Sequence, residues 1–218
     1  MKTITVKGVG NASVKPDYVV LSMSLETRNK DYERAMREAA EKIDLINKNL
    51  QEIGFEKESV KTTDFNVRTD YESKKDRTGN YYRVFNGYVV YHHLKVSFDF
   101  DTKVLSQALG TIATCIVDPE LSISFTVKNP SAVNEALLKS AAENAKKKAE
   151  ILCAASGTKL GELVNIDYNW GEVNIYSNTN YEMEADCMKG CAIEPYSLDI
   201  EPDDINAADT ATFVWQIG

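Results

Sequence analysis

Cys187 and Cys191 are the residues whose spacing best suits redox chemistry. On a helix the two thiols would lie one turn apart, and in a loop they could form a disulfide. Two free thiols in a loop are the simpler interpretation, and a redox-responsive disulfide is the alternative. A metal site would need two further ligands, and no second cysteine pair or nearby histidine supplies them. Cys115 and Cys153 fall within helical patterns and are predicted to be small core residues.

The two histidines offer little to catalysis or metal binding. His92 and His93 are adjacent on a predicted strand, so their side chains point to opposite faces and cannot easily chelate one ion. His92 shares the apolar face and is expected to be a hydrogen-bonded core residue, whereas His93 is expected to be solvated. The chain has no third histidine and no nucleophile elbow, so no hydrolase triad is predicted.

Two other patterns resemble ligand motifs without meeting their requirements. Gly8 and Gly10 form a G-x-G, but Ser13 replaces the third glycine and a strand follows, so a bulge or a close backbone contact is expected. An acidic cluster lies near the C-terminus: Glu194, Asp199, Glu201, Asp203 and Asp204. It lacks the spacing of an EF-hand. The sequence therefore predicts no catalytic residue, no metal and no cofactor, and we expect a protein that is not an enzyme.

Tyrosines near the predicted loops are the candidate contact residues, because tyrosine is favoured at protein interfaces. These residues are Tyr71, Tyr81, Tyr82, Tyr176 and Tyr181. The chain has 218 residues and a net charge of −8, which argues against a nucleic-acid partner or an anionic membrane surface. No apolar run is long enough to span a bilayer. The chain as written would stay in the cytoplasm, and one whose leader had been removed would belong in the periplasm or cell envelope.

Hydrophobic periodicity predicts two strand-helix-strand units, then a long helix and closing strands. The predicted elements are strand 19–25, helix 31–54, strand 65–71, strand 88–98, helix 102–116, strand 121–127, helix 130–157, strand 164–168 and strand 207–217. Residues 72–80 are predicted to form an exposed hairpin loop. Clean alternation in the strands predicts an α+β fold, with antiparallel-rich sheets and helices packed on one face.

The long helix has clear ends and an unusual buried face. Asn129 suits the N-cap, Pro130 suits the first turn, and Gly157 supplies the stop. The predicted buried face consists of Val133, Leu137, Ala141, Ala145, Ala149 and Leu152. Because most of these side chains are small, the helix is expected to dock closely onto a sheet or another helix.

Several segments together resemble one known family. They are Gly8 with Val14, Pro16 and Asp17; the run Asn86, Gly87 and Tyr88; the long helix with Leu160 and Gly161; and Ile200, Pro202, Asp204 and Ile205. With these, the chain resembles the SIMPL domain family (DUF541), which includes a periplasmic Brucella antigen. The resemblance implies an α+β fold, ring-like or channel-like oligomers and export of many bacterial members. Animal members are linked to innate immune kinase signalling, and some bacterial members to oxidative-stress tolerance.

The resemblance carries no agreed active site, so no catalytic residue is assigned from it. It implies a single SIMPL-like domain over residues 1–218. The repeated strand-helix-strand pattern predicts pseudo-repeated halves at 1–85 and 86–218, and a variable insertion at about 170–199 departs from the family. We expect a homo-oligomer that acts in protein interaction or stress response, with loop tyrosines and sheet edges as contacts and another protein as an alternative partner. A redox-responsive protein using Cys187 and Cys191 is the alternative function.

Overall fold

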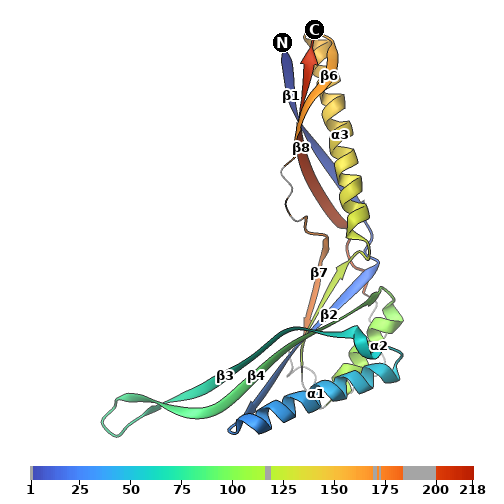
Figure 1. Cartoon of the computed structure of the whole chain (residues 1–218). Coiled ribbons are helices and arrows are strands. Elements are labelled where there is room, and N and C mark those ends of the chain that lie inside the picture. Colours follow the sequence, from blue (N-terminus) through green and yellow to red (C-terminus); the bar gives the residue numbers. More distant parts are fainter. Residues whose placement is uncertain (1, 116–118, 169–170, 172, 184–199) are drawn as a thin grey trace. The chain divides into compact units, whose positions relative to one another are not determined.

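The computed structural model describes residues 2–115, 119–168, 171, 173–183 and 200–218 (Figure 1). Its elements are β1 Thr3–Val14, β2 Tyr18–Asn29, α1 Tyr32–Glu52, η1 Lys57–Ser59, β3 Val60–Lys75, β4 Tyr81–Asp99, α2 Thr102–Thr114, β5 Glu120–Thr126, α3 Pro130–Ala155, β6 Leu160–Asp167, β7 Tyr176–Met183 and β8 Ile205–Ile217. The strands form two sheets, of order β1-β8-β6 and β3-β4-β2-β5-β7. This architecture confirms the predicted α+β fold.

The chain folds into two compact units. Unit 1 comprises Met1–Asp17, Phe125–Thr179 and Pro202–Gly218, and unit 2 comprises Tyr18–Ser124 and Asn180–Glu201. The pseudo-repeated halves stay a prediction, because these units are defined by spatial contacts and not by internal repetition. In the described part of the chain, no helix is both long and apolar enough to cross a bilayer.

In unit 1, helix α3 lies along the three-stranded sheet, mainly over β1 and β8 (Figure 1). Asn129 caps α3 by accepting a hydrogen bond from the Ala132 N–H at 3.3 Å, as the sequence predicted. The prediction that Leu152 is buried was wrong, because Cys153 takes that position in the core and Leu152 is exposed. Buried residues recur every four positions, so the line of contact drifts around a helix of 3.6 residues per turn.

Gly8 and Gly10 allow α3 to approach β1 closely. A Cβ on Gly8 would lie 2.1 Å from the Ala141 carbonyl oxygen, and one on Gly10 would lie 1.9 Å from that of Leu137. Any side chain at either glycine would therefore collide with the helix backbone. The close backbone contact predicted for this G-x-G is confirmed, and so is the tight docking predicted for the small-residue face.

Polar side chains of α3 also seal the outer edge of β1. Three contacts do so: Asn11 N–H donates to Ser140 Oγ at 3.3 Å, Val9 N–H donates to Asn144 Oδ1 at 3.1 Å, and Lys148 Nζ donates to the Lys7 carbonyl at 3.2 Å. The three helix residues are spaced four apart and the three strand residues two apart. Four residues of a helix rise about 6 Å and two residues of a strand span about 6.7 Å, so the two rows of groups stay nearly in step. These three edge groups of β1 are thus satisfied without another strand, which makes this stretch of the edge less available for unwanted strand pairing.

In unit 2, helix α1 packs on β2 and β4 and contacts α2. The side chain of Asp31 caps α1 by accepting from the Arg34 N–H at 2.9 Å. The core beneath the helices is made of alternating strand residues and one face of each helix: Leu21, Met23, Leu94, Val96, Ile46, Leu50, Leu105 and Ile112 are all nearly inaccessible to solvent. These are faces that the periodicity predicted.

The β3–β4 hairpin continues past the end of β2 (Figure 1). The last β2–β4 pair is Asn29 with Tyr88, whereas β3 and β4 stay paired as far as Lys75 and Tyr81. We call the two-stranded extension, residues 71–87, the arm. Only residues 76–80 form its turn, so the hairpin loop predicted at 72–80 is shorter and its strands are longer.

Strand β7, Tyr176–Met183, lies within the predicted variable insertion. Its sequence, YSNTNYEM, has neither apolar alternation nor an apolar run, which explains why no strand was predicted there. Ser177 and Thr179 hold it by hydrogen bonds to the backbone of Asp203 at 2.7 and 3.0 Å.

Candidate functional site

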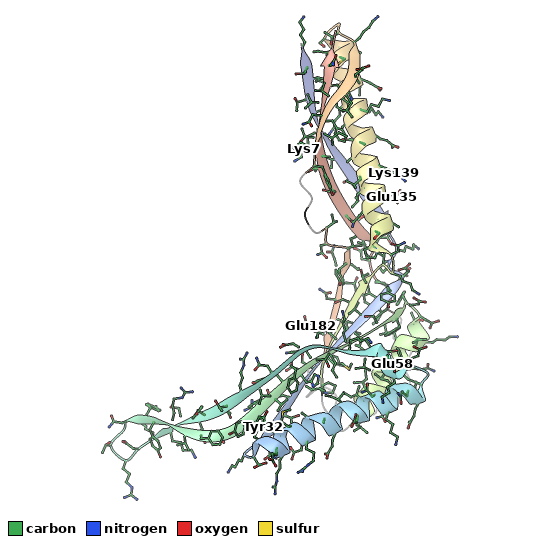
Figure 2. The ribbon with its side chains drawn as sticks, viewed as in Figure 1. Lys7, Tyr32, Glu58, Glu135, Lys139 and Glu182 are labelled. Carbon is green, nitrogen blue, oxygen red and sulfur yellow. The ribbon has the colours of Figure 1, made fainter. Side chains whose placement is uncertain are left out.

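Exposed aromatic rings form a continuous strip along the arm. Tyr71 contacts Phe85, Phe85 contacts Tyr88, and Tyr88 contacts Tyr32, with centroids 5.8, 5.3 and 5.4 Å apart and edge-to-face geometry. Tyr71, Phe85 and Tyr32 are 44%, 45% and 48% exposed. Tyr32 marks the end of the strip at the start of α1 (Figure 2). We call these four residues the aromatic strip.

The aromatic strip extends the core face of the sheet beyond its covering helix. Tyr88 packs with Val90 against Ala35 and Ala39 of α1, so it belongs to the face that the helix covers. Phe85 contacts Tyr88 from the arm, where α1 no longer lies over the strands. An apolar face that runs past its covering element, and stays exposed, is typical of an interaction surface.

Basic side chains lie over the exposed rings of the arm. The Arg83 guanidinium carbon lies 4.7 Å from the Tyr71 ring centroid, and Lys75 Nζ lies 5.5 Å from that of Tyr81. Such cation–π contacts hold the cations on the face that carries the rings. The arm therefore presents aromatic and positively charged groups together.

The structure places the predicted interface tyrosines in two regions. Tyr71 and Tyr81 lie on one face of the arm, since each is opposite a residue of that face in the strand register, and Tyr82 lies on the other face. Tyr176 and Tyr181 lie in β7 and do not join the aromatic strip. Sequence reasoning missed Phe85, Tyr88 and Tyr32 because it considered only tyrosines near loops.

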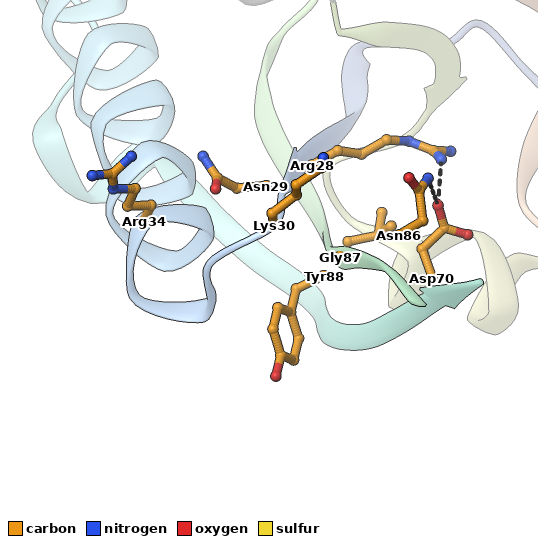
Figure 3. Close-up of a pocket in the computed structure, with 9 residues that line it drawn as sticks. Arg28, Asn29, Lys30, Arg34, Asp70, Asn86, Gly87 and Tyr88 are labelled. Carbon is orange, nitrogen blue, oxygen red and sulfur yellow. Dashed lines mark hydrogen bonds and ion pairs between the residues drawn. The ribbon is translucent and has the colours of Figure 1, made fainter. Parts of the chain in front are cut away.

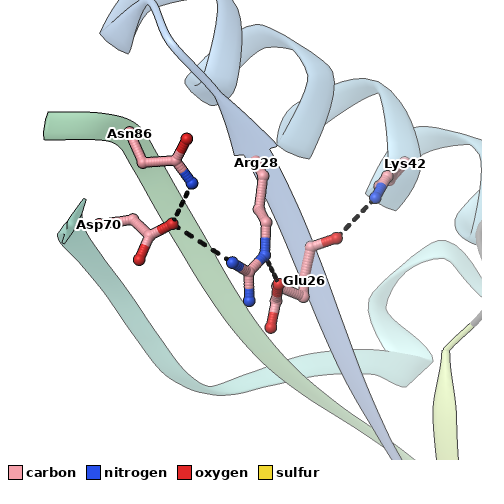
Figure 4. Close-up of polar contacts among 5 residues, drawn as sticks. All are labelled: Glu26, Arg28, Lys42, Asp70 and Asn86. Carbon is pink, nitrogen blue, oxygen red and sulfur yellow. Dashed lines mark hydrogen bonds and ion pairs between the residues drawn. The ribbon is translucent and has the colours of Figure 1, made fainter. Parts of the chain in front are cut away.

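A polar cluster forms the base of the arm (Figure 4). The Arg28 guanidinium binds the Glu26 carboxylate and lies 3.4 Å from Asp70 Oδ2, which also accepts from Asn86 Nδ2 at 2.7 Å. The hydrogen bond that Arg28 donates to Glu26, more than the charge of Glu26 or of Asp70, raises the pKa of Arg28 above its ordinary value. The cluster joins β2, β3 and β4 at the point where the arm begins.

A pocket of about 460 Å³ opens beside this cluster (Figure 3). Arg28, Lys30 and Arg34 line it together with Asp70. Its floor includes Gly87, which has φ +141°, and a Cβ there would lie 2.6 Å from the Asn29 carbonyl oxygen. Glycine is therefore required at this position. Glu26 and Asp70 neutralise the positive charge of Arg28. The charge that remains in the pocket therefore comes mainly from Lys30 and Arg34.

The two histidines are held by hydrogen bonds on opposite faces of β4. His92 is buried, its Nε2 lies 2.9 Å from Thr62 Oγ1, and its Nδ1 has no hydrogen-bond partner among the residues that the structure describes. Burial lowers the pKa of His92, and His93 adds a smaller effect in the same direction. His92 is thus the core residue that was predicted. His93 was expected to be solvated, but it is half-buried with Nδ1 2.8 Å from Ser24 Oγ.

The described cysteines are both buried. Cys115 and Cys153 are free and lie in the core, as predicted. Burial raises the pKa of the Cys115 thiol, which accepts a hydrogen bond from Asn49. Cys187 and Cys191 lie outside the described residues, so the redox-responsive alternative stays a prediction. Among the residues that the structure describes, no group of three or more His, Cys, Asp or Glu could hold a metal ion.

Comparison with known proteins adds a family to this geometry. The family model SIMPL, "protein of unknown function (DUF541)", matches residues 4–215. The 26 kDa periplasmic immunogenic protein of Brucella melitensis is 27% identical over 163 residues, which make up 75% of this chain and 65% of that protein. The protein of the same description from Brucella abortus is 26% identical over 163 residues. The chain thus spans about 65% of the length of these relatives. Because the family model covers nearly the whole chain, this protein belongs to the SIMPL family.

Proposed function

We propose that this SIMPL protein is a non-enzymatic protein that assembles with copies of itself. The observation that carries the proposal is the aromatic strip, which continues a core face into solvent. A two-stranded hairpin is marginally stable alone in water, and an aromatic ring buries about 150–250 Å² when it is covered. Contact with a second protein surface would both stabilise the arm and remove its rings from water.

The chemistry of the arm favours a protein surface over other partners. The net charge of −8 opposes binding to nucleic acid or to an anionic membrane. Clustered tyrosine, phenylalanine and arginine are the residue types enriched at the centres of protein interfaces. The printed names of the Brucella relatives support a periplasmic location for this chain, and they give no support to the cytoplasm.

The mass of the protein in solution tests this proposal. Light scattering after size exclusion, over a wide range of concentrations, should give a discrete multiple of the 24.3 kDa chain mass. Replacing Phe85 by Ser should lower the assembled fraction, because it removes the central ring of the aromatic strip. The exposed Lys61→Ser is the control, and it should leave the mass unchanged. A single-chain mass at the highest concentration would overturn the proposal.

A further inference from the structure

Strand β6 is a second place where a sheet face runs past its covering helix. Leu163 and Ile166 lie opposite Trp215 and Phe213 of β8, whose stacked rings are buried beneath α3. Directly opposite residues share a face, so Leu163 and Ile166 belong to the same apolar face. They remain 49% and 51% exposed because α3 covers β1 and β8 and hardly reaches β6.

We propose that the arm of one copy docks on β6 of a second copy, with the aromatic strip beside the exposed aliphatic side chains of β6. This inference rests on the proposed self-assembly and names the two surfaces that would carry it. Aromatic rings on one partner and aliphatic side chains on the other would together exclude water from the contact.

Charge complementarity selects a second copy as the occupant. The arm carries four basic residues and two acidic ones: Lys74, Lys75, Arg77 and Arg83, against Glu72 and Asp76. Strand β6 carries Glu162 and Asp167 and no basic residue. Copies with a net charge of −8 repel one another, so a favourable contact between them has to use a locally basic surface. The arm is such a surface, and β6 has the opposite charge.

Both strands also have an edge available for pairing. Among the described residues, strand β4 has no partner on its outer edge from Tyr81 to Gly87, since its pairing with β2 ends at Tyr88. Strand β6 is the last strand in the order β1-β8-β6, while the opposite edge strand, β1, is sealed by side chains of α3. Strand addition at an open edge would align the two apolar faces and supply backbone hydrogen bonds.

Because the two surfaces differ, the contact can repeat from copy to copy in a closed ring or an open chain, or occur twice in a two-fold dimer whose copies exchange arms. It also predicts that damage to either surface alone will stop assembly.

Charge reversal tests the contact with little risk to folding, since all the altered side chains are exposed. The double variant Lys75→Glu with Arg83→Glu, and separately Glu162→Lys with Asp167→Lys, should each fall to the single-chain mass where the wild type is assembled. An equal mixture of the two double variants should assemble again, because an arm and a β6 strand of opposite net charge then meet wherever two unlike copies are in contact. Lys61→Glu with Lys95→Glu is the matched control on the same hairpin outside the arm, and it should stay assembled.

The results separate this inference from the proposed function. If either charge-reversed double variant still assembles as the wild type does, the arm–β6 contact is overturned and self-assembly stands. Failure of the mixture to recover would also overturn it. A wild type that stays a single chain would overturn both proposals.

Photo-crosslinking provides a test that needs no loss of assembly. A benzophenone amino acid in place of Tyr81, in a mixture of isotopically light and heavy chains, should crosslink to the β6 peptide of the other isotope. If every crosslink joined two peptides of the same isotope, the arm would dock within its own chain, and the proposal would be overturned. The same group at Lys61 should give no β6 crosslink.

Discussion

A single extra residue, Asn86, sets which face of the arm carries the rings. Asp70 is opposite Gly87 and Tyr71 is opposite Phe85, so Asn86 is a bulge on β4. Without it, strict alternation from Tyr88 would place Phe85 on the other face of the hairpin. The bulge is fixed by the hydrogen bond from Asn86 to Asp70 and by the glycine conformation at position 87. The aromatic strip therefore depends on a local backbone irregularity.

His92 gives the protein a pH-dependent stability. Its folded pKa lies below the unfolded value of about 6.5, chiefly because the ring is buried. Below that pH the unfolded chain therefore binds more protons than the folded chain does. The contribution of His92 to the free energy of unfolding is fully present above that pH and is progressively lost as the pH falls. One proton accounts for at most about 1.4 kcal/mol per pH unit. Between pH 7.5 and pH 5.5, the free energy of unfolding measured in urea should fall less for His92→Gln than for the wild type. Equal losses in both proteins would contradict the role of His92.

At the scale of elements, α3 is both a cover and an edge seal for unit 1. Its small residues bring it against Gly8 and Gly10, and that proximity lets Ser140, Asn144 and Lys148 reach the backbone of β1. The same helix leaves β6 uncovered. One helix thus closes one edge of the sheet, while the opposite edge has no strand partner in the part of the chain that the structure describes.

Asn144 tests the edge seal. Asn144→Ala removes the acceptor for the Val9 N–H and should lower the free energy of unfolding by about 0.5–1.5 kcal/mol. Asn144→Asp keeps an acceptor oxygen and should retain most of the stability. Amide exchange at Val9, followed by NMR, should accelerate in the alanine variant and stay near the wild-type rate in the aspartate variant. Unchanged exchange in the alanine variant would show that the contact does not protect the edge.

The sequence predicted elements well where periodicity and caps agreed, and less well where tertiary contacts decide. The start of α3 at Asn129 and the contact at Gly8 and Gly10 followed from residue type. Leu152 was misplaced because the drift of the buried line depends on how the helix crosses β1. Tyr71 and Tyr81 of the candidate surface were found from residue type, but Phe85 was not, because the bulge at Asn86 is invisible to a strict period of two.

At the scale of the whole molecule, each unit has its own core. Two clusters of buried side chains belong wholly to unit 1, around Phe213 with Trp215 and around Leu137 with Ile205. The cluster of Ala35, Ala39 and Val90 belongs wholly to unit 2. Since stability follows buried contacts, the two units are expected to open with separate free energies.

Two alanine substitutions with opposite expected effects on stability test whether the two units unfold independently. Gly10→Ala forces a Cβ against α3 and should destabilise unit 1 by about 1–3 kcal/mol. Gly110→Ala meets no atom within 4 Å and lies inside α2, so it should stabilise unit 2 by roughly 1 kcal/mol. Hydrogen exchange measured by mass spectrometry should therefore speed up in β1, α3 and β8 for the first variant and slow down in β2, α1 and α2 for the second. Changes that spread across both units in either variant would show that the chain unfolds as one cooperative body.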